Sequence, residues 1–569
     1  MSVPTTSADM TWSGAAAPVI VDAAGESSAA RPPSRAYEEV LRKWADVLGT
    51  KHVLHDPTTL DRYSRSTLPT STRPRAVLRP ASTQQVRELV VIANTHRVPL
   101  YPISRGKNWG YGDACAVTDG QVIVDLSRMN RIVEVNPTLA YAVIEPGVTQ
   151  QQLYDYLREH DYPLWLDATG AGPDSSIVGN TLERGFGHTP YGNRFQHMAG
   201  MEVVLADGTV LNTGFGSYEN AQAARVFPAG IGPWLDGLFT QSNLGIVTQM
   251  GVWLLPAPPV CQAFAFKVRH ERDIEAVVEA LRPLRLMDVV RSAVHIANDL
   301  RVISARRRYP WELTGGATPL PDDVRRRLQK EAGIGAWNAM GGLYGTRETV
   351  AAARKVVRRS LRHLAHVHFF GERKMEFGLR AANLLSRIGL ARHFLETIES
   401  ANSIFQLLRG IPSSEPLKGI SWRTKASADG TAADPSDCGV LWLSPVLPMT
   451  GSATREILDL VEPIFREFQF EPLITLASVT ARALVCVLSV CYDKEDRRDA
   501  AQATACYESL FEAVMNHGYV PYRSGIQSMR KLSRRSSVFW DVTRQIKLAL
   551  DAQQTLAPGR YQPDEEPLL

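Results

Sequence analysis

Hydrophobic positions repeat with two different periods along the first half of the chain. Between residues 76 and 256, short runs rich in valine and isoleucine alternate with glycine turns and helix-like stretches. Residues 83–98 place Val86, Leu89, Val90 and Ala93 at helical spacing, which predicts a helix with one buried face. The runs predicted as strands are AVLRP, GQVIVDLS, IVEV, YAVIEPG and MEVVLADGTV.

From about Val260 to Asp499 helical and strand-like patterns are mixed. Residues 371–408 show an apolar stripe at helical spacing, which predicts a lid, a subunit contact, a membrane-surface helix or simple core packing. Further along, residues 504–523 read as a helix followed by a loop. The stripe consists of Phe377, Ala381, Leu384, Leu385, Ile388, Ala391, Leu395 and Ile398.

The segment 473–492, LITLASVTARALVCVLSVCY, imitates a membrane span. Because Arg482 lies at its middle and no anchoring belt flanks it, buried strands or a core helix are the better prediction. Residues 1–30 contain no lysine or arginine, so we predict no signal peptide and a cytoplasmic location. Residues 1–35 are rich in Ser, Thr, Ala and Pro and are predicted to be a disordered tail.

Composition narrows the class of protein. Of the 569 residues 44% are hydrophobic and 21% charged, which excludes wholesale disorder, collagen and coiled coil. The 63 Lys and Arg against 59 Asp and Glu give a net charge of +4, which argues against a dedicated nucleic-acid binder. The 6 cysteines form no CxxC pair, so zinc ribbons are excluded. Three histidines between His363 and Phe370 lack further metal-binding partners, so we expect no metal site and a solvent-facing strand there.

The segment ISRGKNWGYG, residues 103–112, is the most informative for function. Its glycines permit successive backbone N–H groups to converge on one anion, although a tight turn would use the same residues. It matches neither a P-loop nor a dinucleotide fingerprint. Two further glycine-rich stretches, residues 175–192 and 241–250, follow on the strand-rich scaffold. Together the three loops predict a site for an extended ligand that contains a pyrophosphate.

The strings NWGYG, VIEPGVT, VGNTLERG, HTPYGNRF, GMEVVLADGTV and LDGLFTQSNLGIVTQMG resemble the vanillyl-alcohol oxidase and para-cresol methylhydroxylase flavoprotein family. The later strings ALRPLR, GAWNAMGGLYGT, GYVPYR and LAPGR resemble the same family, over residues 54–561. The resemblance implies an α+β protein of two domains that binds FAD and oxidises para-substituted phenols. It implies a disordered tail over 1–35, an FAD-binding domain over 36–258, a cap domain over 259–508 and a return to the FAD-binding domain over 509–569.

The resemblance also implies which residues contact the cofactor. Residues 104–112 match the pyrophosphate loop, and a turn at residues 145–147 matches a second flavin contact. Residues 179–187 match the loop beside the flavin ring, and residues 245–247 match the adenosine side. An arginine of LAPGR matches a residue close to the flavin. These positions are Ser104, Arg105, Gly106, Lys107, Asn108, Trp109, Gly110, Tyr111, Gly112, Glu145, Pro146, Gly147, Gly179, Asn180, Thr181, Gly185, Gly187, His188, Gly245, Ile246, Val247 and Arg560.

Tyr111, Tyr522 and Arg523 match the family's residues that bind the substrate phenolate. The chemistry of these side chains is consistent with that role. A phenol has a pKa near 10, so its anion needs stabilisation at neutral pH. Two hydroxyl groups and a guanidinium supply charge-assisted hydrogen bonds to the anion.

The sequence departs from the family where FAD is attached covalently. The attachment positions, a tyrosine or a histidine in relatives, fall on Ile420 and Val440. Neither side chain can form that bond, so non-covalent FAD is predicted. Cys438 lies two residues away and is either a thiolate attachment point or a buried unreactive cysteine.

Two more departures lie in the string ERGFGHTPYG. Glu183 takes the position of an acid–base carboxylate near flavin N5, or else it is a surface carboxylate paired with Arg184. His188 stands where a tyrosine is usual, and is either an acid or base or a hydrogen-bonded packing residue.

The basic run 529–535 is either an ordinary solvated face or, because it follows the phenolate residues, a receptor for an anionic group on a phenolic-acid substrate. Such a phenolic acid favours oxidative decarboxylation to a styrene; water addition, giving a benzylic alcohol, or a carbonyl product are the alternatives. We expect oxygen or a cytochrome as electron acceptor and a homodimer. A flavin-binding protein without enzymatic activity is the remaining hypothesis.

Overall fold

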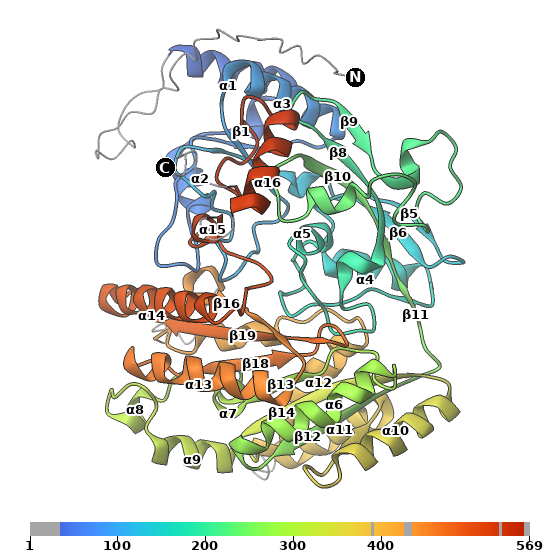
Figure 1. The fold of residues 1–569 in the computed structure, drawn as a ribbon, viewed down its shortest axis with the longest axis vertical. Helices are drawn as coiled ribbons and strands as arrows, with labels where there is room; N and C mark the ends of the chain where they lie inside the picture. The colour runs from blue at the N-terminus through green and yellow to red at the C-terminus, as the bar shows by residue number, and fades with distance from the viewer. Residues whose placement is uncertain (1–34, 388–391, 426–434, 534–536, 563–569) are drawn as a thin grey trace, which may run out of the picture.

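The computed structural model describes residues 35–387, 392–425, 435–533 and 537–562, which form two domains one above the other (Figure 1). The first domain combines the amino-terminal part of the chain, up to about residue 259, with the last helices. The second domain is inserted between them and begins at strand β12, Val260–Val268. The predicted disordered tail lies outside the described residues.

The first domain contains a four-stranded sheet in the order β1-β2-β4-β3. The helices α1, Arg35–Leu48, and α3, Thr83–His96, pack together over it. The predicted helical face of α3 is buried, and the Trp44 indole N–H of α1 donates a hydrogen bond to the Leu89 carbonyl. The strands are β1, Val53–Leu54, β2, Val77–Leu78, β3, Leu100–Ile103, and β4, Val122–Asp125.

A second sheet of the same domain is antiparallel, in the order β5-β6-β10-β8-β9. The helices α4, Gln150–Glu159, and α5, Ile177–Leu182, share its hydrophobic core. The strands are β5, Ile132–Asn136, β6, Tyr141–Ile144, β8, Met198–Val204, β9, Val210–Asn212, and β10, Ile246–Trp253. Every run predicted as a strand in this half of the chain therefore contains one.

The second domain is built on an antiparallel sheet in the order β15-β12-β14-β13-β18-β19-β16. Residues 473–492 supply two of its strands, so the apparent membrane span is a pair of buried strands, as predicted. Of the helices that the structure describes, none is both long and apolar enough to cross a membrane. The other strands are β13, His295–Asn298, β14, Trp337–Gly345, β15, His368–Phe370, β16, Gly439–Leu443, β18, Leu473–Ala477, and β19, Ala483–Tyr492, with β17, Val446–Pro448, beside β19.

The two faces of this sheet have different partners. On β19, Leu484, Cys486 and Leu488 belong to the main hydrophobic core, whereas the alternate residues Val487 and Ser489 line a cavity. This period of two is the ordinary consequence of strand geometry. The helices that complete the core are α6, Ile274–Leu286, α10, Arg347–Leu361, α13, Gly451–Glu467, and α14, Arg497–Asn516.

The predicted domain boundary at residue 509 falls inside helix α14. Leu510, Phe511 and Val514 of that helix are buried in the core of the second domain. The chain returns to the first domain after the helix, where α16, Ser537–Leu550, lies beside its first elements (Figure 1). Leu556 then forms a β-bridge with Leu100 of β3.

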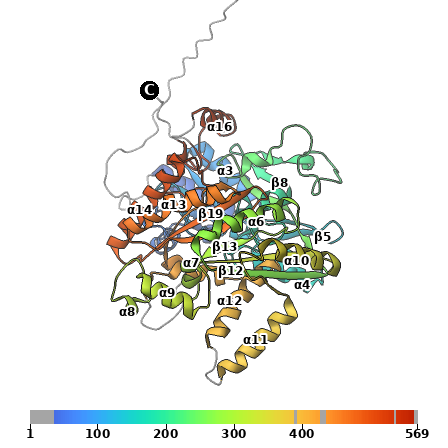
Figure 2. The same cartoon turned by 60° about the horizontal axis from the view of Figure 1, so that its bottom comes forward.

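The predicted stripe in residues 371–408 forms two helices, α11, Glu372–Arg387, and α12, Arg392–Leu408, at the far edge of the second domain (Figure 2). Phe377 and Leu384 are 75% and 65% exposed, so the stripe is not one continuous buried face. Met375 and Phe405 instead provide the contact with β12 and β14. Ile388 and Ala391 lie outside the described residues.

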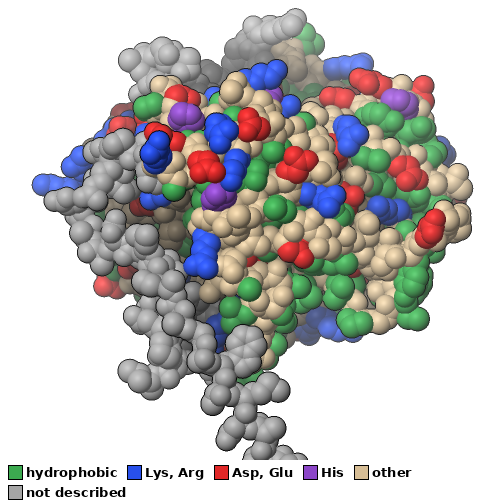
Figure 3. Space-filling model, turned by 90° about the horizontal axis from the view of Figure 1, so that it is seen from above, with side chains coloured by type: hydrophobic (Ala, Val, Ile, Leu, Met, Phe, Trp, Pro, Cys, Tyr) green, Lys and Arg blue, Asp and Glu red, His purple; other side chains and the backbone are tan. Residues whose placement is uncertain are grey.

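The surface carries no dominant charge on the face seen from above in Figure 3, where acidic and basic side chains are interspersed. His368 of the predicted histidine-rich strand lies exposed on β15, at the edge of the sheet in the second domain. On that face, as in the whole sequence, basic and acidic side chains therefore nearly balance.

Lys547 provides a test of how firmly the carboxy-terminal return is anchored. Its side chain is 1% exposed, and its Nζ donates hydrogen bonds to Asp551 and to the carbonyls of Asn243 and Leu556. Burial lowers the pKa of Lys547, although Asp551 opposes this. We expect Lys547→Met to lower the free energy of unfolding by about 3 to 5 kcal/mol, because it leaves Asp551 buried without its cation.

Chemical denaturation measures this effect, with Lys531→Met as the matched control. Lys531 pairs with Glu508 at the surface, so its loss is expected to cost less than about 1 kcal/mol. Equal effects of the two substitutions would contradict the anchoring role of Lys547.

Candidate functional site

A cavity of about 350 Å³ lies between the two domains. Its walls combine the three glycine-rich loops of the first domain with one face of the sheet in the second domain. The structure thus brings together most of the residues predicted from the sequence. Those that line the cavity are Ser104, Arg105, Gly106, Lys107, Asn108, Trp109, Tyr111, Gly179, Asn180, Glu183, Gly185, His188, Gly245, Ile246, Val247, Tyr522, Arg523 and Arg560.

The loop after β3 presents a run of free backbone donors. Within the described part of the chain, the N–H groups of residues 105–109 make no hydrogen bond, and all five residues line the cavity. Unpaired backbone donors are costly unless a ligand or water satisfies them, and consecutive ones form an anion-binding nest. The side chains of Arg105 and Lys107 add positive charge. This arrangement fits a pyrophosphate.

Two glycines of this loop serve a different purpose from the predicted one. Gly110 and Gly112 do not line the cavity, and both have positive φ angles, 70° and 126°. A Cβ atom on Gly110 would lie 3.0 Å from the Trp442 ring, and one on Gly112 would lie 2.9 Å from Ile526. They therefore allow the loop to approach β16 and the segment that follows α14.

Tyr111, Tyr522 and Arg523 line the same end of the cavity. The Arg523 guanidinium lies 4.0 Å from the centre of the Tyr111 ring, and the Tyr111 hydroxyl is 2.9 Å from Ser444 Oγ. Burial raises the pKa of Tyr111, so its hydroxyl stays protonated. Burial opposes the charge of Arg523, but Tyr522 and Tyr111 outweigh it and its pKa is raised. A cation and a hydroxyl donor are thus held side by side.

Glu183 is not the surface carboxylate that was one of its two predicted roles. Its side chain is only 10% exposed, and its carboxylate contacts Arg523 at 3.4 Å and, more closely, Arg560. The Tyr561 hydroxyl donates to it at 3.1 Å. Two guanidiniums and a hydroxyl thus contact this carboxylate. These contacts suit a positioning role, and the acid–base role stays a prediction.

Other predicted cofactor residues support the cavity from behind. Glu145 accepts hydrogen bonds from the Arg131 backbone N–H and guanidinium, and the Pro146 carbonyl accepts one from the Ser176 hydroxyl. Ser176 in turn caps helix α5. Glu145, Pro146, Gly147, Thr181 and Gly187 do not line the cavity, in contrast to the sequence prediction.

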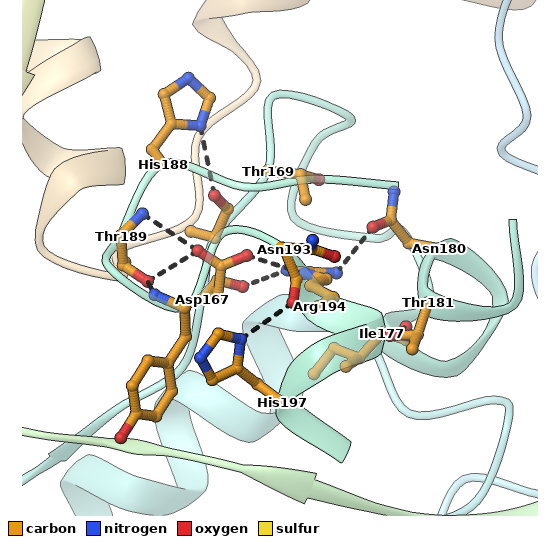
Figure 4. Close-up of polar contacts among 12 residues, drawn as sticks. Asp167, Thr169, Ile177, Asn180, Thr181, His188, Thr189, Asn193, Arg194 and His197 are labelled. Atoms are coloured by element: carbon orange, nitrogen blue, oxygen red, sulfur yellow. Dashed lines mark hydrogen bonds and ion pairs between the residues drawn. The ribbon is translucent and has the colours of Figure 1, made fainter. Parts of the chain in front are cut away.

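The loop that carries His188 is fixed by a buried ion pair (Figure 4). Arg194 Nε donates to Asp167 at 2.9 Å, and Asp167 also accepts the backbone N–H and the hydroxyl of Thr189. Arg194 reaches Asn180 in addition, at 3.2 Å. A Cβ on Gly187 would overlap Asp167, so this glycine is required for the close approach. In Figure 4 the His188 ring points away from this cluster.

The positions matched to covalent flavin attachment lie behind the cavity wall. Ile420, Val440 and Cys438 share one buried cluster, and none of them lines the cavity. Leu417 and Trp442 form the wall there. The described part of the basic run, α15, Met529–Ser533, does not line the cavity either.

Several lining residues were not predicted from the sequence. His295, Thr475, Ser489 and Ser444 come from the second domain, where they alternate with or follow core residues on strands. Arg301 comes from α7, Asp299–Ser304. The period-two pattern of β18 and β19 contained the signal for the polar positions on the strands, but only sheet order shows which face meets the first domain.

Proteins with known names resemble this chain in sequence. A family model described as an FAD binding domain matches residues 74–214. The 1'-carboxy-chondrochloren decarboxylase of Chondromyces crocatus is 40% identical, over 92% of this chain and 97% of that protein. The flavoprotein subunit of the hydroxylating 4-cresol dehydrogenase of Pseudomonas putida is 32% identical, over 92% and 95%.

Two solved structures share the fold over almost the whole chain. A crystal structure of p-cresol methylhydroxylase with substrate bound has a TM-score of 0.83, with 32% identity over 93% of this chain and 97% of that one. The 4-ethylphenol oxidase from Gulosibacter chungangensis, in complex with isoeugenol, has a TM-score of 0.84, with 28% identity over 93% and 98%. The two-domain α+β fold expected from the sequence is thereby confirmed.

Proposed function

The chain belongs to the vanillyl-alcohol oxidase and para-cresol methylhydroxylase family of flavoproteins, and we propose that it oxidises a para-substituted phenol with FAD. The observation that carries this proposal is the convergence of Tyr111, Tyr522 and Arg523 at one end of the cavity. That convergence separates a phenol-oxidising enzyme from a protein that only stores a flavin.

The residues present fit FAD. The free N–H groups of residues 105–109 suit its pyrophosphate, and residues 245–247 and Arg560 line the same cavity. FAD supplies a two-electron acceptor for hydride when it is bound. We propose that it is held non-covalently, because Ile420 and Val440 cannot attach it and Cys438 is buried behind the wall.

The mode of attachment can be tested directly. Precipitation with acid is expected to release the FAD into the supernatant. A yellow pellet would show a covalent link instead and would overturn this part of the proposal.

We assign the binding of the substrate's phenolate oxygen to Tyr111, Tyr522 and Arg523. Arg523 compensates the phenolate charge, and the hydroxyl groups of Tyr111 and Tyr522 donate hydrogen bonds to its oxygen. A bound phenolate directs electron density to its para carbon, so the benzylic C–H bond breaks as hydride and a neutral quinone methide remains. Glu183 holds Arg523 and Arg560 in place.

The fate of the quinone methide defines the product. With a carboxylate on the carbon next to the benzylic one, the C–C bond to the carboxylate breaks and its electron pair enters the quinone methide. Carbon dioxide leaves, the ring regains its aromaticity, and a styrene forms. The similarity to a decarboxylase over 97% of that protein supports this outcome for the present chain.

The alternative outcome is addition of water to the quinone methide, which gives a benzylic alcohol. The similarity to a hydroxylating dehydrogenase supports it. The name of that relative describes a flavoprotein subunit, which implies a further subunit. A cytochrome, expected from the sequence resemblance, is therefore a candidate electron acceptor here beside oxygen. Anaerobic reoxidation by an added cytochrome would distinguish the two acceptors.

Anaerobic bleaching of the flavin near 450 nm tests the proposed function. We expect 3-(4-hydroxyphenyl)propanoate to bleach it and to yield a product that has lost carbon dioxide. If 4-propylphenol bleaches it and the product carries one additional oxygen atom, because water has added to the quinone methide, the hydroxylating alternative holds. If no para-alkylphenol bleaches the flavin, phenol oxidation is wrong for this protein.

Tyr522→Phe tests the assigned phenolate site. The variant removes one donor to the phenolate oxygen, so kcat/KM for the active phenol is expected to fall about 100-fold. Tyr141→Phe is the control, because the Tyr141 hydroxyl donates to Glu134 outside the cavity, and it is expected to leave the rate unchanged. A similar kcat/KM in both variants would show that Tyr522 does not bind the phenolate.

A further inference from the structure

Two histidines form a stack in the wall of the cavity. His188 follows helix α5 in the first domain, and His295 opens strand β13 in the second. Their ring centres are 4.1 Å apart and their planes differ by 15°, and both residues line the cavity. The stack therefore joins the two domains across the site.

The ring nitrogens of this pair have unused hydrogen-bonding capacity. His188 Nδ1 is 3.3 Å from the Ala168 carbonyl, so it acts as the donor and Nε2 is left over. His295 Nε2 is buried and has no hydrogen-bond partner among the described residues. A buried polar atom without a partner costs free energy unless a ligand or water completes it.

The surroundings keep the pair uncharged. Burial lowers the pKa of His188, with Asp167 opposing and Arg194 assisting. Burial also lowers the pKa of His295 strongly, and His188 lowers it further. Both rings are therefore neutral near pH 7. An anion placed against them would favour protonation, because an opposite charge stabilises the imidazolium.

The stack lies beyond the phenolate end of the cavity. The Phe186 ring is 5.6 Å from the Tyr522 ring on one side and 6.3 Å from the His295 ring on the other. All three rings line the same cavity. A phenol held by Tyr522 and Arg523 can therefore extend its para substituent past Phe186 towards the histidines.

We propose that the His188–His295 stack binds the carboxylate on the side chain of the phenolic substrate. The proposal rests on the proposed function, since it assumes a phenolate held at Tyr522 and Arg523. It assigns to the histidines the task that the sequence had suggested for the basic run. Arg301 of the second domain also lines the cavity and is a cation. Its guanidinium, however, already donates to the Pro416 carbonyl and contacts Ser304.

The proposal predicts that carboxylate binding is coupled to proton uptake. (4-Hydroxyphenoxy)acetate and 4-ethoxyphenol form a suitable ligand pair, since an ether oxygen replaces the benzylic carbon and no hydride can leave. Titration calorimetry of the FAD-loaded enzyme at pH 7, in phosphate and in Tris, gives the affinity and the number of protons exchanged. Each phenol releases a proton when it binds as the phenolate. The carboxylate ligand is therefore expected to release up to one proton fewer than 4-ethoxyphenol, because the histidines take one up.

His295→Phe keeps a stacked ring but removes both nitrogens. It is expected to weaken binding of (4-hydroxyphenoxy)acetate about tenfold or more, with 4-ethoxyphenol changed less than about twofold, and to abolish the difference in proton release between the two ligands. His295→Gln, which retains an N–H donor but cannot be protonated, is expected to keep part of the affinity and to lose that difference. Should the phenylalanine variant fold poorly, the glutamine variant decides the question.

Three outcomes separate this inference from the proposed function. Equal loss for both ligands in His295→Phe would make the stack a packing feature and overturn the inference. Loss of carboxylate preference in Arg301→Gln, but not in His295→Phe, would overturn it in favour of the arginine. If the wild-type enzyme binds neither phenol, the proposed function itself fails.

Discussion

One buried carboxylate makes the rest of the site possible. Two guanidiniums, Arg523 and Arg560, are brought beside the cavity by separate parts of the carboxy-terminal return, and like charges repel strongly where solvent is excluded. Glu183, at the end of helix α5, contacts both and compensates their charge. The carboxylate therefore fixes where the returning chain meets the first domain, and with it the position of the guanidinium that faces a bound phenolate.

The second domain contributes through the strict alternation of its strands. On β19, Leu488 and Val490 belong to the core, and Val487 and Ser489, which alternate with them, line the cavity. The residues that hold the sheet together are therefore different from those that meet a ligand. Polar side chains such as Thr475 and His295 can occupy the inner face without exposing the hydrophobic core to water.

Local patterns in the sequence predicted the elements and the glycine-rich loops well. Helix α3 and its buried face follow from the spacing of Val86, Leu89, Val90 and Ala93, and the strands at 473–492 follow from an interrupting Arg482. The phenolate residues and most of the cofactor loop came from the family resemblance. What no local pattern contains is the pairing of distant segments.

The failures are of that long-range kind. The partners of Glu183 lie more than three hundred residues away, so its burial could not be read from its neighbours. His295 looked like one strand residue among many until sheet order placed it against His188. Gly110 and Gly112 appeared to belong to an anion site because their spacing is the same whether a phosphate or Trp442 and Ile526 lie nearby.

The path of the chain between the domains has a consequence for recombination. Tyr522 and Arg523 lie on the connection that follows α14, and the Tyr522 backbone N–H donates a hydrogen bond to the Ser444 carbonyl of the inserted domain. An exchange of the inserted domain between relatives, with junctions at residues 259 and 517, would bring in His295 and its sheet but leave His188 and Phe186 with the recipient. Tyr111, Tyr522 and Arg523 would also remain with the recipient. Such a chimaera would therefore keep one parent's phenol-binding residues and divide the wall around the para substituent between two parents.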